Sequence, residues 1–310
     1  MVNLKSCAII YNPNSGKNKK LNFIDKFKMI LKEYGYDVEF YKTNYHGHAK
    51  EIVKTLKQMD LVISIGGDGT FSEVMSGNFE RKEKLLLAHI PTGTANDVGA
   101  MYGYGKNMCR NLRLLLNGKV KEIDICTINN SPIVYVAGLG KFVNISYDTP
   151  RKLKKKYGYF AYLIEGVKEV REKIGTYKVK CEINGEIIED NLSFIMISNA
   201  NRIAGINNFY KDVKLDDNCF EVLMSNINQK KDLLKNLYYL TKTDVTNLPG
   251  FKFYKTNYIK IEFDKPLKKG WSVDGEEYLG NKQYFEIKIV NDVEILLPEK
   301  NIKKLFVEVE

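Results

Sequence analysis

The sequence predicts an α/β domain with a mostly parallel sheet, followed by a second domain that is largely antiparallel β-sheet. Three observations lead to this fold class. The chain has 310 residues, which at about 150 residues per domain suggests two domains. Strand and helix patterns alternate up to about residue 122, and such alternation favours a parallel sheet covered by helices. Beyond that point, strand-like stretches dominate.

In the first domain, each element follows from the spacing of its apolar residues. Short apolar runs predict strands, whereas apolar residues three and four positions apart predict helices. In chain order, the expected elements are strand Ala8–Tyr11, helix Leu21–Tyr34, strand Val38–Tyr41, helix Ala49–Lys57, strand Leu61–Ile65, helix Thr70–Asn78 and strand Leu85–Ile90. Ligands of parallel sheets bind beyond the carboxyl ends of the strands, so the loops that follow these strands are candidate site loops.

The second domain is expected over residues 123–298, and the closing segment 299–310 is expected to rejoin the first domain, residues 1–122. The dipeptide Asn184-Gly185 predicts a tight hairpin turn. The expected strands are Ile133–Leu139, Tyr177–Ile183, Ile187–Asn191, Phe194–Ser198, Phe220–Met224, Tyr258–Phe263, Tyr284–Val290 and Val293–Leu297, with helices near Lys152–Lys173 and Gln229–Lys242.

Composition narrows the classes of partner and compartment. The 48 basic and 38 acidic residues give a formal charge of +10, which favours anionic partners such as nucleic acid, an anionic membrane or a phosphorylated substrate. Five cysteines without a C-x-x-C pair favour a reducing compartment. The longest apolar runs are far shorter than the ~20 residues that span a bilayer. We therefore expect a cytoplasmic protein that meets membranes, if at all, from the surface.

Residues Gly66–Gly69 form a glycine-rich turn between an expected strand and an expected helix. Glycines let the backbone approach a ligand closely, and a helix N-terminus suits a phosphate. Thr70 and Glu73 have the spacing of a capping box. Asp68 would repel a bare phosphate, so its presence indicates a bridging Mg²⁺. An ordinary strand–turn–helix connection is the alternative interpretation of the same residues.

Two further polar loops also follow strands of this sheet. Asn12–Lys17 offers a turn, a hydroxyl, a glycine and a cation, and Pro91–Asp97 offers hydroxyls and amides. Neither the G-x-x-x-x-G-K-[ST] loop nor the G-x-G-x-x-G loop is present. Each loop alone is an ordinary connection, but three at one sheet edge indicate a site for a phosphorylated ligand.

The three motifs N-P-x-S-G-K, G-G-D-G-T and P-x-G-T-x-N-D, in this order, resemble those of the diacylglycerol kinase catalytic-domain family. That family includes bacterial soluble lipid kinases, sphingosine kinases and ceramide kinases. Further resemblances lie in Gly47-His48-Ala49, Gly158–Tyr162, Leu215–Asp217 and Val273–Glu276, so the likeness covers nearly the whole chain. The G-G-D-G-T motif alone is shared with NAD kinases and, in similar form, with phosphofructokinases.

The resemblance implies a Rossmann-like parallel sheet of the NAD-kinase and phosphofructokinase type, a C-terminal antiparallel β-sandwich, and a nucleotide site in the interdomain cleft. It implies an ATP-dependent transfer of the γ-phosphate to a lipid hydroxyl, with diacylglycerol as acceptor and Mg²⁺ as cofactor. The nucleotide-binding residues that it implies are Asn12, Ser15, Gly16, Lys17, Thr43, Gly66, Gly67, Asp68, Gly69, Thr70, Thr92, Thr94 and Asn96, with Asp97 organising the third loop.

Three carboxylates are the implied catalytic residues. Glu276 resembles the family's general base, because transfer to an alcohol requires a group that accepts the hydroxyl proton. Asp124 matches an acidic position that acts with this glutamate, and Asp68 holds Mg²⁺ against the phosphates. From the residues alone, the favoured interpretations are a plain hairpin turn at Asp274-Gly275 and an edge-strand carboxylate at Asp124.

The resemblance also implies a second, structural Mg²⁺ site. Its ligands would be Asp217 and the backbone carbonyls of Lys214 and Cys219. Asn218 replaces the glycine that is usual in this loop, and asparagine tolerates left-handed backbone better than most residues. The loop conformation is therefore expected to be retained.

Several alternatives remain open at this point. The acceptor could be another lipid alcohol, such as a sphingoid base, an isoprenoid alcohol or another glycerolipid. NAD kinase and an inactive nucleotide- or lipid-binding regulator are the other candidates. The basic run Arg151–Lys156 predicts peripheral contact with an anionic membrane, nucleic acid is not expected as a partner, and a homodimer is left open.

Overall fold

The computed structural model describes residues 4–16, 23–140, 174–203, 205–239, 245–278 and 280–307. The chain forms two compact units. Unit 1 comprises residues 1–125, 214–217 and 291–310, and unit 2 comprises residues 126–213 and 218–290. Two strands, β5 (Lys119–Ile128) and β18 (Tyr284–Leu297), contribute residues to both units. Residues 214–217 and 291–298 belong to unit 1, although the sequence grouped them with the β-rich part.

Unit 1 is built on a parallel sheet. Its strand order is β2 (Tyr36–Lys42), β1 (Lys5–Tyr11), β3 (Leu61–Gly66), β4 (Leu87–Pro91) and the second half of β18. All four neighbouring pairs are parallel. Every residue of β3 is buried, as expected for a central strand that is covered on both faces.

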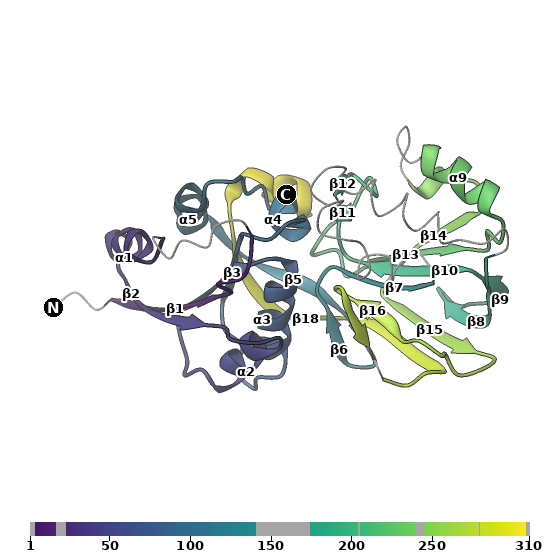
Figure 1. The fold of residues 1–310 in the computed structure, drawn as a ribbon, viewed down its shortest axis with the longest axis horizontal. Coiled ribbons are helices and arrows are strands. Elements are labelled where there is room, and N and C mark those ends of the chain that lie inside the picture. Colours follow the sequence, from purple (N-terminus) through teal and green to yellow (C-terminus); the bar gives the residue numbers. More distant parts are fainter. Residues whose placement is uncertain are drawn as a thin grey trace. The chain divides into compact units, whose positions relative to one another are not determined.

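Helices cover both faces of this sheet (Figure 1). Helices α1 (Phe23–Glu33) and α5 (Met108–Leu116) lie on one face, and α2 (His48–Thr55) and α3 (Asp68–Phe79) lie on the other. Two short helices complete the unit: α4 (Asp97–Met101) follows β4, and α10 (Ile302–Leu305) follows a 3₁₀ turn at Glu299–Asn301.

Unit 2 consists of two antiparallel sheets that share one apolar core. The first sheet is formed by the first half of β18, β15 (Tyr258–Phe263), β8 (Tyr177–Ile183) and β9 (Glu186–Leu192). The second has the order β14 (Phe251–Thr256), β13 (Phe220–Ser225), β10 (Phe194–Ser198), β7 (Val136–Gly140), β16 (Trp271–Val273) and β17 (Glu276–Tyr278). Alternate residues point into the core, as in β8, where Val179, Cys181 and Ile183 are buried.

Smaller elements complete unit 2. Strand β6 (Ser131–Ile133) pairs with β5, and β11 (Arg202–Ile203) pairs with β12 (Ile206–Asn207). Helix α9 (Lys230–Tyr239) and a 3₁₀ turn at Val245–Asn247 lie between β13 and β14 in the chain.

The structure confirms the predicted fold class, and the differences concern individual elements. Asn184 and Gly185 have φ values of 51° and 79°, which confirms the predicted hairpin turn between β8 and β9. The predicted strand 133–139 is broken into β6 and β7, whereas the two strands predicted over 284–297 form the single strand β18. The sequence did not predict α4 or α5. The predicted helix 152–173, the start of the one at 21–34 and the end of the one at 229–242 lie outside the described residues.

Within the described ranges, no helix is long and apolar enough to cross a membrane.

Candidate active site

In unit 1, four neighbouring parallel strands end at the same edge of the sheet. In the registers of these pairs, Tyr11 at the end of β1 lies opposite Lys42 and Ile65, and Gly66 lies opposite Pro91. The segments that begin at Asn12, Thr43, Gly67 and Thr92 therefore emerge side by side. The fold brings the three predicted loops and Thr43 together at the carboxyl edge of the sheet, as the order of strands and loops in the sequence predicted.

Hydrogen bonds join these loops to one another. Backbone bonds run from Asn12 N to Ile65 O (3.0 Å), from Thr43 N to Tyr11 O (2.9 Å) and from Thr92 N to Gly66 O (2.6 Å). Two side-chain bonds cross between loops: Asn12 Nδ2 donates to Thr70 Oγ1 at 3.4 Å, and Thr92 Oγ1 donates to Ser15 Oγ at 3.1 Å. The hydroxyls predicted to bind phosphate therefore already contact each other.

Glycine is required where the loops meet. A Cβ atom added to Gly93 would lie 2.6 Å from the Cα of Gly67 and 2.9 Å from Oδ1 of Asn96. Gly16 has a φ of 73°, and a Cβ there would overlap the carbonyl oxygen of Thr92. Side chains at these positions would push the loops apart, so the glycines make a close-packed cradle possible.

Asp68 is held by the start of α4. Its Oδ2 accepts a hydrogen bond from the backbone N of Asp97, and its Oδ1 accepts one from the backbone N of Val98, both at 3.1 Å. Asn96 precedes them in a left-handed conformation with a φ of 52°, and its Nδ2 donates to the carbonyl of Gly93 at 3.0 Å. The third loop therefore fixes the carboxylate of the second loop through backbone amides.

The predicted capping box at Thr70 and Glu73 is wrong. Helix α3 begins at Asp68 with Gly67 as its N-cap residue, and no side chain caps it. Glu73 instead accepts a hydrogen bond from the backbone N of Ala49, in the first turn of α2, at 3.1 Å. The Thr70–Glu73 spacing predicted a bond within α3. The Glu73 carboxylate instead caps α2, because α2 and α3 pack against each other.

A buried histidine lies behind the glycine turn, and no pattern in the sequence singles it out. His89 on β4 has its Nδ1 2.7 Å from Oγ of Ser64 on β3, and its ring stacks on Phe71 of α3 with a centroid distance of 4.8 Å. Burial lowers the pKa of His89 to about 3, so the ring is neutral at neutral pH. His89 thus contacts the elements on both sides of the glycine turn.

The other predicted nucleotide residues differ in exposure. Thr43 is buried, with only 5% of its surface exposed, whereas Gly69 and Thr94 are exposed at the sheet edge. Lys17 lies outside the described residues.

Asp124 lies on β5 and is 6% exposed. Its backbone N donates to the carbonyl of Leu215 at 2.7 Å. The sequence placed Asp124 at the start of the second domain, but the chain up to Ile125 belongs to unit 1. Asp124 therefore belongs to the same unit as Asp68.

Glu276 lies in unit 2 and follows a tight hairpin turn. Asp274 and Gly275 have φ values of 48° and 96°, so the two-residue turn between β16 and β17 is of the type that favours Asp-Gly. The Asp274 carboxylate accepts hydrogen bonds from the backbone N atoms of Val134, Tyr135 and Val136, at 2.8 to 3.1 Å. This buried aspartate anchors the turn, while Glu276 is exposed. The hairpin interpretation and the catalytic one are therefore compatible.

The predicted structural metal loop has the backbone that was expected. Asn218 adopts a left-handed conformation with a φ of 56°. Lys214 and Asp217 belong to unit 1, and Cys219 belongs to unit 2. Among the described residues, no three His, Cys, Asp or Glu side chains gather as a metal-binding group, and a site with one carboxylate and two carbonyls needs none.

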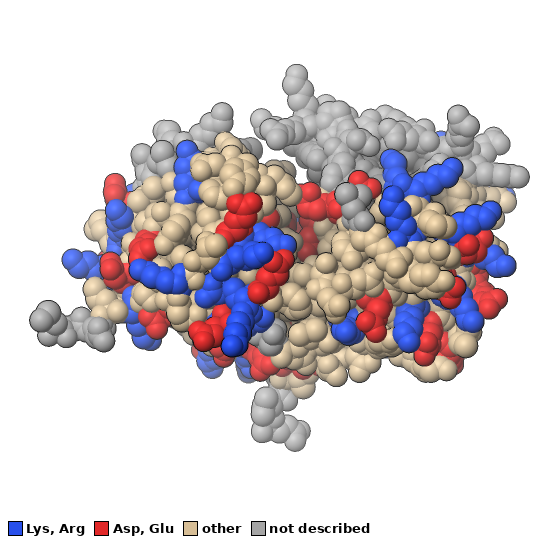
Figure 2. All heavy atoms as spheres, turned by 90° about the horizontal axis from the view of Figure 1, so that it is seen from below, with Lys and Arg blue, Asp and Glu red and all other residues tan. Residues whose placement is uncertain are grey.

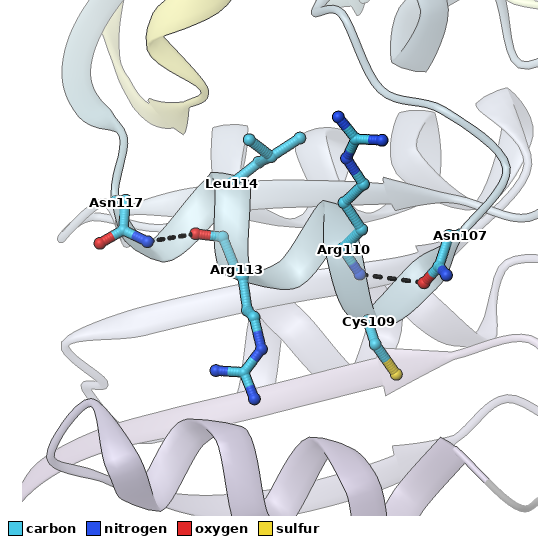
Figure 3. Close-up of a pocket in the computed structure, with 6 residues that line it drawn as sticks. All are labelled: Asn107, Cys109, Arg110, Arg113, Leu114 and Asn117. Carbon is cyan, nitrogen blue, oxygen red and sulfur yellow. Dashed lines mark hydrogen bonds between the residues drawn. The ribbon is translucent and has the colours of Figure 1, made fainter.

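A separate hollow of about 360 Å³ lies on α5 (Figure 3). It is lined by Asn107, Cys109, Arg110, Arg113, Leu114 and Asn117. Its polar groups bond within α5 and to the end of α1. Asn107 Oδ1 accepts from the backbone N of Arg110 at the N-cap, Asn117 Nδ2 donates to the carbonyl of Arg113 and to the hydroxyl of Tyr34, and Arg113 pairs with Glu33. None of the predicted site residues lines this hollow.

Comparisons with known proteins identify the family of the chain. The family of the diacylglycerol kinase catalytic domain matches residues 6–128. A diacylglycerol kinase of Staphylococcus epidermidis strain RP62A is 30% identical over 298 residues, covering 93% of each chain. One of Bacillus subtilis strain 168 is 24% identical, covering 97% of this chain and 99% of the relative.

A crystal structure of a diacylglycerol kinase from Bacillus anthracis strain Sterne has the same fold. The TM-score is 0.78 at 23% identity, with 97% of this chain and 100% of that chain covered. The motifs, the fold and the 30% identical relative lead to one conclusion: the chain belongs to the diacylglycerol kinase family, and it is an ATP-dependent kinase.

Proposed function

We propose that this protein transfers the γ-phosphate of ATP to the hydroxyl group of a membrane lipid, with diacylglycerol as acceptor and phosphatidic acid as product. The observation that carries the proposal is the meeting of three glycine-containing loops at the carboxyl edge of the unit 1 sheet, where Asp68 is fixed by α4. The relatives are named diacylglycerol kinases, which favours diacylglycerol as the acceptor. In this proposal, unit 2 binds the lipid substrate.

The loops would bind the nucleotide phosphates. Ser15 and Thr92 supply hydroxyls 3.1 Å apart, and Lys17 would add a positive charge. Gly67 and Gly93 let backbone amides approach the phosphates without interference from side chains. Most of the rate of phosphoryl transfer comes from such positioning and from charge stabilisation.

Asp68 fits the role of a ligand to phosphate-bound Mg²⁺. Its carboxylate oxygens accept backbone hydrogen bonds from Asp97 and Val98, which hold the carboxylate in place, and carboxylate oxygens are ligands that Mg²⁺ favours. Mg²⁺, when bound there, would neutralise phosphate charge. The second Mg²⁺, at Asp217 and the carbonyls of Lys214 and Cys219, is a separate part of the proposal, supported by the left-handed Asn218.

Glu276 is the proposed general base. Its carboxylate would accept the proton of the lipid hydroxyl as the hydroxyl oxygen bonds to the γ-phosphorus and the bond to the bridging oxygen of ADP breaks. The exposure of Glu276 leaves it accessible, and the anchored Asp274 holds its turn in place. Asp124 would assist from its buried position on β5.

Contact with a membrane surface and a cytoplasmic location are further parts of the proposal. The charge of +10 supports attraction to anionic lipids. On the face drawn in Figure 2, Lys and Arg side chains are interspersed with Asp and Glu, so this face presents no single basic patch. The predicted contact run Arg151–Lys156 lies outside the described residues.

The deciding experiment is transfer of label from γ-labelled Mg·ATP to a panel of acceptors. The panel contains diacylglycerol in anionic mixed micelles, sphingosine, undecaprenol, NAD and a total bacterial lipid extract. The Glu276→Gln variant is compared with Glu277→Gln, which changes the adjacent exposed glutamate. We expect label in phosphatidic acid with wild type and with Glu277→Gln, no label with Glu276→Gln, and retained ATP binding in all three.

The other outcomes discriminate between the alternatives. Label only in sphingosine or undecaprenol would show that the acceptor is a different lipid alcohol, while phosphoryl transfer to a lipid hydroxyl would stand. Label only in NAD would show that the shared glycine turn had been misread. Turnover by Glu276→Gln would remove Glu276 as the base, and ATP binding without any transfer would favour a regulator.

A further inference from the structure

The C-terminal segment Asn301–Val307 of unit 1 contacts the helix that holds Asp68. Asn301 Nδ2 donates to the carbonyl of Met101, the last residue of α4, at 2.7 Å. The approach is close, because a Cβ atom on Gly103 would lie 3.1 Å from Nδ2 of Asn301. The other end of α4 provides the two amides that bind the Asp68 carboxylate. The segment therefore supports α4 at the end opposite to Asp68.

The same segment is connected to Asp124 by a backbone relay. The backbone N of Asp124 donates to the carbonyl of Leu215, and the backbone N of Leu215 donates to the carbonyl of Leu305, both at 2.7 Å. Leu215 and Leu305 are 3% and 1% exposed, so these bonds are shielded from water. Residue 215 thus lies between the strand of Asp124 and the C-terminal helix α10.

The ammonium group of Lys214 binds the carbonyl groups at the end of α10. Its Nζ lies 3.4, 3.2 and 3.0 Å from the carbonyl oxygens of Lys303, Lys304 and Phe306. The last carbonyls of a helix lack partners within the helix and carry partial negative charge, so an ammonium with three N–H donors suits them. Asp216 complements Lys214, because its Oδ1 accepts from the backbone N of Val307 at 2.7 Å.

Strand β5 makes its own contact with the segment. The Nζ of Lys121 lies over the ring of Phe306, 5.2 Å from its centroid, and Phe306 is 1% exposed. The C-terminal segment is therefore held from β5, from residues 214–216 and from α4, all within unit 1.

We propose that Asn301–Val307 is a brace that sets Asp124 relative to Asp68, and that Lys214 is the positioning residue that locks it. This inference rests on the proposed function, in which both aspartates act in phosphoryl transfer. The side chain of Lys214 has this task in addition to the role proposed for its backbone carbonyl. Loosening the brace would displace Asp124 without removing any group that contacts ATP or lipid.

The test compares Lys214→Met with Lys214→Arg and with the control Lys300→Met. The Met variant removes the ammonium but keeps the backbone carbonyl, Arg restores N–H donors, and Lys300 is an exposed lysine just before the brace. For each protein, kcat, the KM for lipid, the dissociation constant for ATP and the amide hydrogen exchange of residues 119–128 are measured.

For Lys214→Met, we expect kcat to fall by about tenfold or more, because small displacements of a catalytic group have large effects on rate. The ATP dissociation constant should change by less than about threefold, since the loop contacts remain. Exchange at the Asp124 amide should rise by about tenfold. Lys214→Arg should recover most of the lost rate, and Lys300→Met should match wild type.

The inference is overturned if Lys214→Met keeps the kcat and the Asp124 exchange of the control while Asp124→Asn is inactive. If wild type transfers no phosphate to any acceptor, the proposed function fails, and hydrogen exchange at Asp124 still decides whether the brace exists. Should Lys214→Met not fold, Asn301→Ala tests the other end of the brace by the same kcat and exchange measurements.

Discussion

The backbones of Gly67 and Gly93 pack directly against each other, so closely that a Cβ atom on Gly93 would lie 2.6 Å from the Cα of Gly67. The two glycines come from different loops, one after β3 and one after β4. Their contact joins the loop that carries Asp68 to the loop whose amides hold it.

Gly93→Ala is expected to weaken ATP binding by about tenfold, because the new methyl group must push the two loops apart. The dissociation constant for ATP, measured by calorimetry, checks this. Gly105→Ala is the matched control, since a Cβ at Gly105 meets nothing within 4 Å. Equal affinities for the two variants would show that the loop contact does not shape the nucleotide site.

Asp274→Ala is expected to lower the free energy of unfolding by about 2–4 kcal/mol, because the three partly buried backbone N–H groups of Val134–Val136 lose their carboxylate acceptor. Urea unfolding measures this loss. Asp264→Ala, at an exposed aspartate, should stay within about 0.5 kcal/mol of wild type. A similar small change for both would mean that Asp274 does not anchor the turn before Glu276.

Glu73→Ala is expected to lower the free energy of unfolding by about 1 kcal/mol, because the first turn of α2 loses its acceptor at Ala49 N. Glu73→Gln should keep most of this energy, since an amide oxygen also accepts a hydrogen bond. Thermal unfolding of both variants, with the exposed Glu83→Ala as control, checks the difference. Equal losses for Ala and Gln would point to the charge rather than the bond.

His89 is expected to make stability depend on pH. Burial lowers its pKa to about 3 in the folded protein, from the ordinary value of 6.5. Below pH 6.5, His89 binds a proton in the unfolded chain but not in the folded chain. The contribution of His89 to the free energy of unfolding therefore falls as pH falls. The loss is about 1.4 kcal/mol per pH unit.

The measurement is urea unfolding of wild type and His89→Phe at pH 7.5, 6.5 and 5.0. The difference in unfolding free energy between the two proteins should change by only about 0.4 kcal/mol from pH 7.5 to 6.5, where half of the unfolded chains carry the proton. At pH 5.0, the unfolding free energy of wild type relative to His89→Phe should be about 2 kcal/mol lower than at pH 7.5. Parallel pH profiles over the whole range would contradict the buried, neutral state of His89.

The local patterns predicted most of unit 1 because its strands are short apolar runs bounded by glycine and asparagine. The strand predicted at Leu61–Ile65 was clear for this reason, and the Asn184-Gly185 hairpin of unit 2 was clear from its turn dipeptide. Helix α5 was missed although its own apolar residues have helical spacing. The break between β6 and β7 is not visible in an apolar run, because it depends on the Asp274 carboxylate binding the backbone there.

The sequence by itself determined the motif loops, their order and the edge of the sheet where they emerge, because parallel strands place their carboxyl ends together. Only the tertiary structure decided the partners of these loops. Asp68 is bound by α4, Glu73 serves α2 instead of its own helix, and Leu215 connects Asp124 to the C-terminal segment. These contacts join residues 24 or more positions apart, so local spacing contains no information about them.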